Sequence, residues 1–178
     1  MPACQKCLGY VICLYIHGCS LYNFLYKYIN FYRSSKKDKL KKRNKGVDVE
    51  ERQLFHGTSN DTVEAIYRQG FDFRLSGTAS GTAYGKGSYF ATTAKYSNCY
   101  TDRQKETMGM FIAKVLVGDY TKGDKSYSRP PQKDPHDLSS PLYDSCVDSV
   151  IDPKIFVIFE LGQVYPEYLI KYKSDFSP

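Results

Sequence analysis

Two short segments hold the residue types best suited to gripping a ligand. Residues 56–58 (His-Gly-Thr) place an imidazole beside a glycine, where a ligand can touch the backbone. Residues 85–91 (Gly-Lys-Gly-Ser-Tyr-Phe-Ala) run from a flexible turn into two aromatic rings and a small residue. An imidazole, an open backbone amide and a flat ring are groups that bind a nucleotide and an aromatic amide. Together the segments are typical of a pocket for a nicotinamide dinucleotide.

Hydride transfer on such a dinucleotide would need a different pattern. The fingerprint Gly-x-Gly-x-x-Gly must follow a strand and open a helix. Here Gly85 and Gly87 follow an expected loop and enter an expected strand, and position 90 is Phe. No acidic residue stands at the required distance on a second strand. The sequence therefore argues against a dehydrogenase site.

The elements that must position these segments mix strands with few helices. Alternation and β-branched runs predict strands over 52–56, 88–91, 110–117, 155–159 and 167–172. Helical spacing and capping residues predict helices over 25–40, from the Ser59 cap to Gly70, and over 94–100. Loops are expected over 71–84, 122–141 and 145–153. Because helices do not regularly separate the strands, the fold class is α+β with largely antiparallel pairing.

The positive charge is concentrated in one run. The 178 residues suit a single domain and carry a net charge of +6. Residues 36–45 hold seven Lys or Arg and one Asp, which already give +6. The rest is near neutral, so the charge does not support a diffuse nucleic-acid-binding face over the whole domain. The run itself is interpreted as a solvated helix face, with contact to phosphates or anionic lipid as the alternative.

The first twenty residues are atypical of the rest. Residues 8–25 are mostly apolar but too short and too interrupted by polar residues for a membrane span. They also lack a clear secretory signal. Cys4 and Cys7 have a zinc-like spacing, but Cys13 and Cys19 form no second close pair, so no metal site is expected. The remaining cysteines, Cys99 and Cys146, indicate reduced thiols of an intracellular protein.

Several motifs occur in one order along the chain: Leu-Phe-His-Gly-Thr at 54–58, Gly-Phe-Asp-x-Arg at 70–74, Tyr-Gly-Lys-Gly-x-Tyr-Phe-Ala at 84–91, Tyr-Ser at 96–97, Leu-Tyr-Asp-Ser-Cys-Val at 142–147 and Ile-Phe-Val-Ile-Phe at 155–159. In this order the chain closely resembles the catalytic domain of the poly(ADP-ribose) polymerase family, in its mono-ADP-ribosyltransferase branch. The resemblance runs from about Leu21 to Tyr172. It implies two largely antiparallel sheets with flanking helices around an NAD cleft. Residues 21–178 would be the catalytic domain, with 21–45 a basic amphipathic helix leading in and 1–20 unassigned.

The resemblance also implies roles at the site. His56 would bond the adenosine ribose, and Gly57 would bind the nicotinamide amide through its backbone with Ser97 completing the grip. Tyr100 would stack on the nicotinamide ring, and Tyr89 would close its other side. The loop 71–84 would cover the donor, and the loop 143–153 would face the acceptor. The implied NAD-binding residues are His56, Gly57, Thr58, Arg74, Tyr89, Ala91, Ser97 and Tyr100.

The three implied catalytic positions are His56, Tyr89 and Ile155. Polymer-forming members of the family have a glutamate at the third position. Isoleucine can neither accept a hydrogen bond nor act as a base. Glu160 and Glu167 are expected to face solvent instead. The resemblance therefore implies transfer of a single ADP-ribose from NAD with release of nicotinamide, by a glycosyltransferase; the alternative is an inactive module that binds NAD or ADP-ribose.

The expected partners follow from that activity. NAD would be a co-substrate, no metal would take part, and the acceptors would be proteins, with this protein itself a candidate acceptor. Nucleic acid is not required and a membrane is not expected. The expected localisation is intracellular, in the nucleus, the cytoplasm or both.

Overall fold

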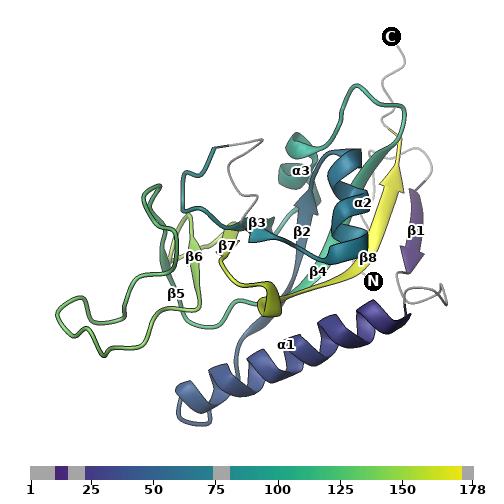
Figure 1. The fold of residues 1–178 in the computed structure, drawn as a ribbon. Coiled ribbons are helices and arrows are strands. Elements are labelled where there is room, and N and C mark those ends of the chain that lie inside the picture. The colour runs from purple at the N-terminus through teal and green to yellow at the C-terminus, as the bar shows by residue number, and fades with distance from the viewer. Residues whose placement is uncertain (1–10, 16–22, 74–80, 174–178) are drawn as a thin grey trace.

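The computed structural model describes residues 11–15, 23–73 and 81–173. Within these residues the strands form one eight-stranded sheet in the order β1-β8-β4-β2-β3-β7-β6-β5 (Figure 1). All neighbours pair antiparallel except β5 and β6, which are parallel. The bounds are β1 Val11–Tyr15, β2 Glu51–Gly57, β3 Ser88–Ala91, β4 Met108–Leu116, β5 Tyr120–Lys122, β6 Ser145–Val147, β7 Ile155–Ile158 and β8 Val164–Tyr172. The α+β class is confirmed.

The expectation of two separate sheets is wrong. The strands β1-β8-β4-β2 and β3-β7-β6-β5 are two halves of one sheet, joined where Phe55 pairs with Ala91. That is the single register pair between β2 and β3. Beyond it β2 continues beside β4 as far as Gly57, while β3 continues beside β7. The two strands therefore diverge, and the end of β2 is left open on its β3 side.

The three expected helices form, and α2 begins and ends at the residues that the sequence indicated. Their bounds are α1 Asn23–Arg43, α2 Asn60–Gln69 and α3 Ala94–Ser97, with 3-10 turns η3 Asn98–Tyr100 and η4 Leu161–Gln163. The Ser59 hydroxyl accepts the Thr62 amide at 3.3 Å and caps α2. Gly70 ends that helix with a positive φ of 80°. The expected helices are confirmed, and α1 is longer than predicted at both ends.

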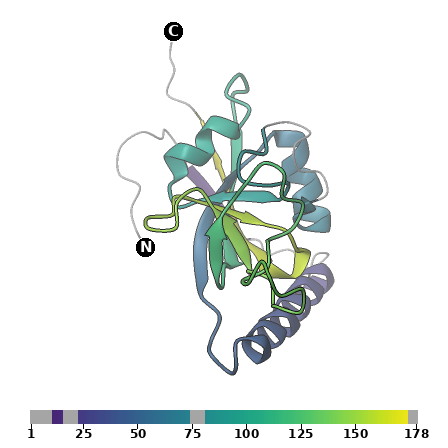
Figure 2. The same ribbon diagram turned by 90° about the vertical axis from the view of Figure 1, so that its left-hand side faces the viewer.

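The alternation of β2 separates the two faces of its half of the sheet. Leu54 packs with α2 residues Val63 and Ile66 in the main core, whereas Phe55 packs with Ala94 of α3 in a second cluster. Helices α2 and α3 accordingly lie on opposite sides of the sheet (Figure 2). The end of β2, which carries the site residues, is therefore covered by a helix on each face of the sheet. No helix of the described residues is both long and apolar enough to cross a membrane.

The region after β4 departs most from the expectations. The predicted loop over 145–153 contains β6, whose three residues are all buried. A strand forms there because the Ser145 hydroxyl donates to the Val117 carbonyl at 2.8 Å, which satisfies a polar side chain inside the core. Residues 123–141 are irregular apart from an isolated bridge between Gln132 and Leu142. They form the long green loop that projects to the left in Figure 1.

Candidate active site

The open end of β2 presents backbone polar groups toward the gap left by β3. The Phe55 carbonyl accepts a hydrogen bond of 3.0 Å from the Ser97 hydroxyl, which fixes the direction of that carbonyl. Backbone groups two residues apart along a strand point to the same edge. The amide and carbonyl of Gly57 therefore point to the side that β3 has vacated. One N–H and one C=O at this place match the acceptor and donor of a carboxamide.

Position 57 has room only for glycine. A Cβ atom built there would lie 2.6 Å from the carbonyl carbon of Ser97 and closer still to its oxygen. Ser97 is 3% exposed and lies on α3, which packs directly over the end of β2. Its hydroxyl hydrogen is engaged by Phe55, which leaves the oxygen lone pairs to accept a hydrogen bond from a ligand. Gly57 and Ser97 thus lie together, as the sequence predicted.

His56 is held in a defined orientation on the opposite face of β2. Its ring lies 5.0 Å from that of Phe71 and 5.3 Å from that of Phe90, centroid to centroid. Its Nδ1 lies 2.7 Å from the Tyr89 carbonyl oxygen. A carbonyl can only accept, so Nδ1 carries the hydrogen. Burial lowers the pKa of His56 below its ordinary 6.5, and in the neutral ring Nε2 keeps a lone pair for a hydroxyl donor.

The glycine-rich turn before β3 locks Tyr89. The Tyr89 hydroxyl donates to the Gly85 carbonyl and accepts the Tyr84 amide, both at 2.9 Å. Gly85 has a φ of 124°, and a Cβ there would lie 2.7 Å from the Phe159 ring. At Gly87 a Cβ would lie 2.6 Å from the Ile158 carbonyl oxygen. The two glycines therefore let the turn pack closely on β7 and on Phe159 beyond its end.

Two tyrosines beside this turn keep exposed ring surface. Tyr100 is 46% exposed and Tyr96 is 40% exposed. Their hydroxyls lie 3.0 Å apart and their ring centroids 5.6 Å apart. Burial and the hydrogen bond to Tyr100 raise the pKa of Tyr96, so Tyr96 stays protonated and uncharged near neutral pH. Tyr100 offers the open ring face that stacking requires.

The third predicted catalytic position is apolar in its surroundings as well as in its identity. Ile155 is 5% exposed and clusters with Cys146, Val157 and Phe159, with Tyr89 packed against the cluster. Its backbone pairs with Ala91, which also pairs with Phe55. Ala91 therefore links the polar end of β2 to Ile155. Thr58 is partly buried between β2 and α2, and Arg74 lies outside the described residues.

The comparisons with known proteins agree with this geometry. A family model described as the poly(ADP-ribose) polymerase catalytic domain matches residues 24–174. The chain belongs to this family. It is 53% identical over 142 residues to the Homo sapiens protein mono-ADP-ribosyltransferase PARP12, a match that covers 80% of this chain and 20% of the relative.

Two further relatives carry similar names. The chain is 44% identical over 157 residues to the Mus musculus protein mono-ADP-ribosyltransferase PARP11, covering 77% of this chain and 46% of the relative. It is 40% identical over 148 residues to the Homo sapiens protein mono-ADP-ribosyltransferase PARP14, covering 82% of this chain and 8% of the relative. The chain thus spans less than half the length of each of these family members.

The two glutamates that could replace a family carboxylate are both engaged elsewhere. Glu160 has an exposed side chain that forms an ion pair with Lys36, as expected of a solvent-facing residue. The expectation is wrong for Glu167, which is 6% exposed. Its carboxylate pairs with Lys114 at 2.7 Å and accepts from Gln53 at 2.9 Å. The register of β8 shifts opposite Ile112 and Ala113, and a bulge of this kind redirects side chains.

One carboxylate that sequence reasoning missed does contact position 155. Asp148 Oδ1 accepts the backbone amides of Lys154 at 2.9 Å and Ile155 at 3.0 Å. These bonds close the loop between β6 and β7. An Asp opening a loop that reaches Pro153 is a turn-forming signal that could have identified it. The loop also contacts the segment between β3 and α3, because the Thr92 amide donates to the Lys154 carbonyl at 2.9 Å.

Two free cysteines lie near the site, Cys146 buried and Cys99 exposed. Burial raises the pKa of the Cys146 thiol to about 12, so it stays protonated near neutral pH. Cys99 is exposed and donates weakly to the Lys95 carbonyl. Within residues 11–15, 23–73 and 81–173 there is no group of His, Cys, Asp and Glu side chains suited to a metal ion. Cys4, Cys7 and Cys19 lie outside those ranges.

Proposed function

We propose that this domain transfers a single ADP-ribose from NAD to a protein side chain and releases nicotinamide. The observation that carries the proposal is the open end of β2, where the Gly57 backbone lies between His56 and Ser97. Membership of the family supports the use of NAD. The matched relatives are named mono-ADP-ribosyltransferases. The proposed catalytic domain is residues 21–178.

Each polar or aromatic group at the site has a separate role in the proposed binding of NAD. The Gly57 amide and carbonyl and the Ser97 oxygen bind the nicotinamide carboxamide, and the Tyr100 ring stacks on the pyridinium. His56 Nε2 accepts a hydroxyl hydrogen of the adenosine ribose, for which its neutral state is required. Tyr89, fixed by its two hydrogen bonds, closes the other side of the nicotinamide. Arg74 and Thr58 complete the proposed contacts.

The reaction then asks for positioning more than for acid–base chemistry. The bond between the ribose carbon C1′ and the nicotinamide nitrogen breaks, and its electron pair neutralises the pyridinium. The ribose becomes an oxocarbenium-like electrophile. A nucleophilic oxygen or sulfur of the acceptor protein forms the new bond to C1′. Holding the donor clamped and the acceptor in line supplies the rate enhancement, and a carboxylate acceptor needs no proton removed.

A single transfer is proposed because nothing at position 155 can activate a second one. Extending a chain requires a base or acceptor for a ribose hydroxyl of the bound unit. Ile155 lies in an apolar cluster beside Tyr89, and Asp148 Oδ1 already accepts two backbone amides. The acceptor side can therefore admit a protein nucleophile without being able to deprotonate the product.

The rival function is binding of NAD without transfer. It is tested by incubating the protein with two preparations of NAD, one labelled in the nicotinamide and one in the adenosine. Transfer predicts that nicotinamide label becomes free while adenosine label stays on protein after denaturation. Release of both labels would indicate hydrolysis, and retention of neither with measurable NAD binding would indicate the inactive module. Either result would contradict the proposal.

A pair of glycine variants locates the activity. Gly57→Val places a side chain against Ser97, whereas a Cβ at Gly46, in the turn after α1, meets no atom of the described residues within 4 Å. We expect Gly57→Val to abolish adenosine labelling and Gly46→Ala to retain it. Equal labelling of both variants would show that the reaction occurs elsewhere.

A further inference from the structure

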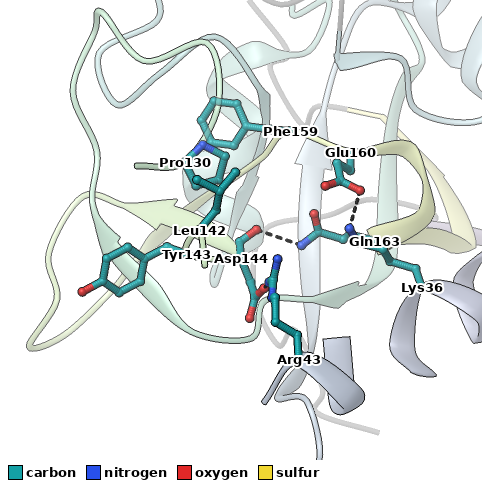
Figure 3. A pocket seen from close by; sticks show the side chains of 9 residues that line it. All are labelled: Lys36, Arg43, Pro130, Leu142, Tyr143, Asp144, Phe159, Glu160 and Gln163. Carbon is teal, nitrogen blue, oxygen red and sulfur yellow. Dashed lines mark hydrogen bonds and ion pairs between the residues drawn. The ribbon is translucent and has the colours of Figure 1, made fainter. Parts of the chain in front are cut away.

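The basic run of α1 is not uniformly a solvated helix face. Lys41 matches that interpretation, since it pairs with the exposed Asp48 at 2.7 Å. Arg43 at the end of the helix instead forms an ion pair with Asp144, whose side chain is 0% exposed. The Arg43 side chain keeps 30% of its exposure, so it reaches inward from the surface. Figure 3 shows it approaching Asp144 along the wall of a small pocket between α1 and the start of β6.

Asp144 depends on Arg43 for one of its oxygens. Its Oδ2 accepts the Asp119 amide at 2.8 Å, and its carbonyl accepts from Gln163 Nε2 at 2.9 Å. Among the described residues Oδ1 accepts no hydrogen bond, and its ion-pair partner is Arg43. A buried carboxylate oxygen without a partner is strongly destabilising. Removing Arg43 would therefore leave a buried charge that the surrounding segments must move to hydrate.

The surroundings of Asp144 are shaped to hold this carboxylate in one place. Gly118 has a φ of 52°, and a Cβ there would lie 2.6 Å from the Asp144 carboxyl carbon. The Gln163 amide also donates to the Leu116 carbonyl at 2.9 Å, so it ties Asp144 to the end of β4. Arg43 is the member of this arrangement that comes from α1. The contact therefore joins the basic run to the sheet.

The segment held at Asp144 continues directly into the candidate site. β6 begins at Ser145, and Cys146 is 0% exposed in the cluster that contains Ile155. Tyr89 packs against that same cluster. The register of β6 on β7, where Cys146 pairs with Val157, thus sets the surface behind the Tyr89 ring. Cys146 lies two positions after Asp144 in the chain, so the buried ion pair is close to that surface.

We propose that Arg43 is a positioning residue for NAD binding, which acts through Asp144 and β6 on Tyr89. The inference rests on the proposed function, because it takes Tyr89 as one wall of the nicotinamide site. It gives the basic run a use other than nucleic-acid or membrane contact. Arg43 touches no substrate in this account. Its effect is to keep β6 seated so that Tyr89 is already in place when NAD arrives.

The test is the dissociation constant of NAD, measured by calorimetry on the full chain beside its melting temperature. Arg43→Met is expected to weaken NAD binding by at least about fivefold, about 1 kcal/mol. Arg43→Lys keeps the charge without the planar fork and is expected to lie between Arg43→Met and the unaltered protein. Lys41→Met removes an exposed pair of the same helix and is expected to change neither measurement. Asp144→Asn combined with Arg43→Met removes the stranded charge together with the contact to α1. This double variant replaces Arg43→Met in the NAD measurement if the single variant does not fold.

The outcomes separate this inference from the function on which it rests. A lower melting temperature with unchanged NAD affinity, in Arg43→Met or in the double variant, would show a merely structural ion pair and overturn the proposal. Equal weakening by Lys41→Met would also overturn it, since net charge would then be the cause. An unaltered protein that binds no NAD would instead overturn the proposed function and the inference with it.

Discussion

The two strands on either side of Ala91 carry opposite chemistry. At the end of β2, His56, Gly57 and Ser97 present polar groups whose directions are set by hydrogen bonds and close packing. At the start of β7, Ile155 lies among apolar side chains. One side can therefore bind and polarise a donor, while the other can only shape the space beside it. The proposed single transfer follows from this contrast, because the polar side would hold the donor while the apolar side has no group to extend the product.

The largest expected effect comes from adding a side chain at Gly57, at the polar end of β2. Gly57→Ala introduces a Cβ that collides with Ser97, so β2 and α3 must separate. We expect a loss of about 1–3 kcal/mol in the free energy of unfolding, as for other overpacked sites. NAD binding should weaken at least about tenfold. Urea unfolding and calorimetry measure the two quantities.

Gly46→Ala is the control for NAD binding, because Gly46 lies in the turn after α1 and a Cβ there meets no atom of the described residues within 4 Å. Its φ of 88° disfavours a side chain, so only the dissociation constants are compared, and that of Gly46→Ala should be unchanged. A Gly57→Ala variant that binds NAD like the Gly46→Ala variant would contradict the proposed role of the β2 backbone.

The next effect concerns the apolar side. Ile155→Glu puts a carboxyl group into a 5% exposed apolar cluster, and burial without a partner should cost about 1–3 kcal/mol or more. The same substitution at Ile151, which is 98% exposed, should cost almost nothing. Unfolding curves compare the two. We also expect no polymer from Ile155→Glu, because the neighbours are built around an isoleucine, and a ladder of products on a gel would show otherwise.

The polar side has a pH dependence of its own. Burial lowers the pKa of His56 below 6.5, so between the folded-state pKa and 6.5 the unfolded chain binds more protons. The stabilisation is fully present above 6.5 and is lost as the pH falls through that window. The free energy of unfolding should therefore drop more steeply from about pH 7 to about pH 5 in the unaltered protein than in His56→Asn. Equal slopes would mean that His56 is not held neutral.

The smallest effect is expected at the exposed ring. Tyr100→Ala removes a stacking face and should weaken NAD binding by about 1 kcal/mol. Stability should change by less than about 0.5 kcal/mol, because Tyr100 is 46% exposed. Phe31→Ala, at a 70% exposed ring of α1, provides the control. If both substitutions leave the NAD dissociation constant unchanged, the proposed nicotinamide position is wrong.

The sequence predicted local structure better than it predicted pairing. The helix α2 follows from Ser59 and Gly70, because capping depends on neighbours in the chain. The strand β6 was missed, because the carbonyl that accepts from the Ser145 hydroxyl belongs to Val117, far away in sequence. The single sheet was missed for the same reason, since it depends on one register pair between β2 and β3.

The site shows the same difference between what neighbouring residues determine and what distant contacts determine. His56, Gly57 and Ser97 could be named from motifs, and the structure brings Gly57 and Ser97 into contact. The burial of Glu167 could not be predicted, because it depends on a register shift in β8. Nor could the pairing of Arg43 with Asp144, which joins the basic run to a residue about one hundred positions later. Charge runs in a sequence show how many charges there are but not which of them find a partner.

The central claim is a single transfer from NAD, and the mass of the reacted protein tests it most directly. After incubation with NAD, intact-mass spectrometry of the modified acceptor, followed by fragmentation, counts the ADP-ribose units on each side chain. We predict one unit per modified residue at every reaction time, with free nicotinamide released in equal amount. Two or more units joined at one residue would contradict the claim, as would NAD consumption without any mass added to protein.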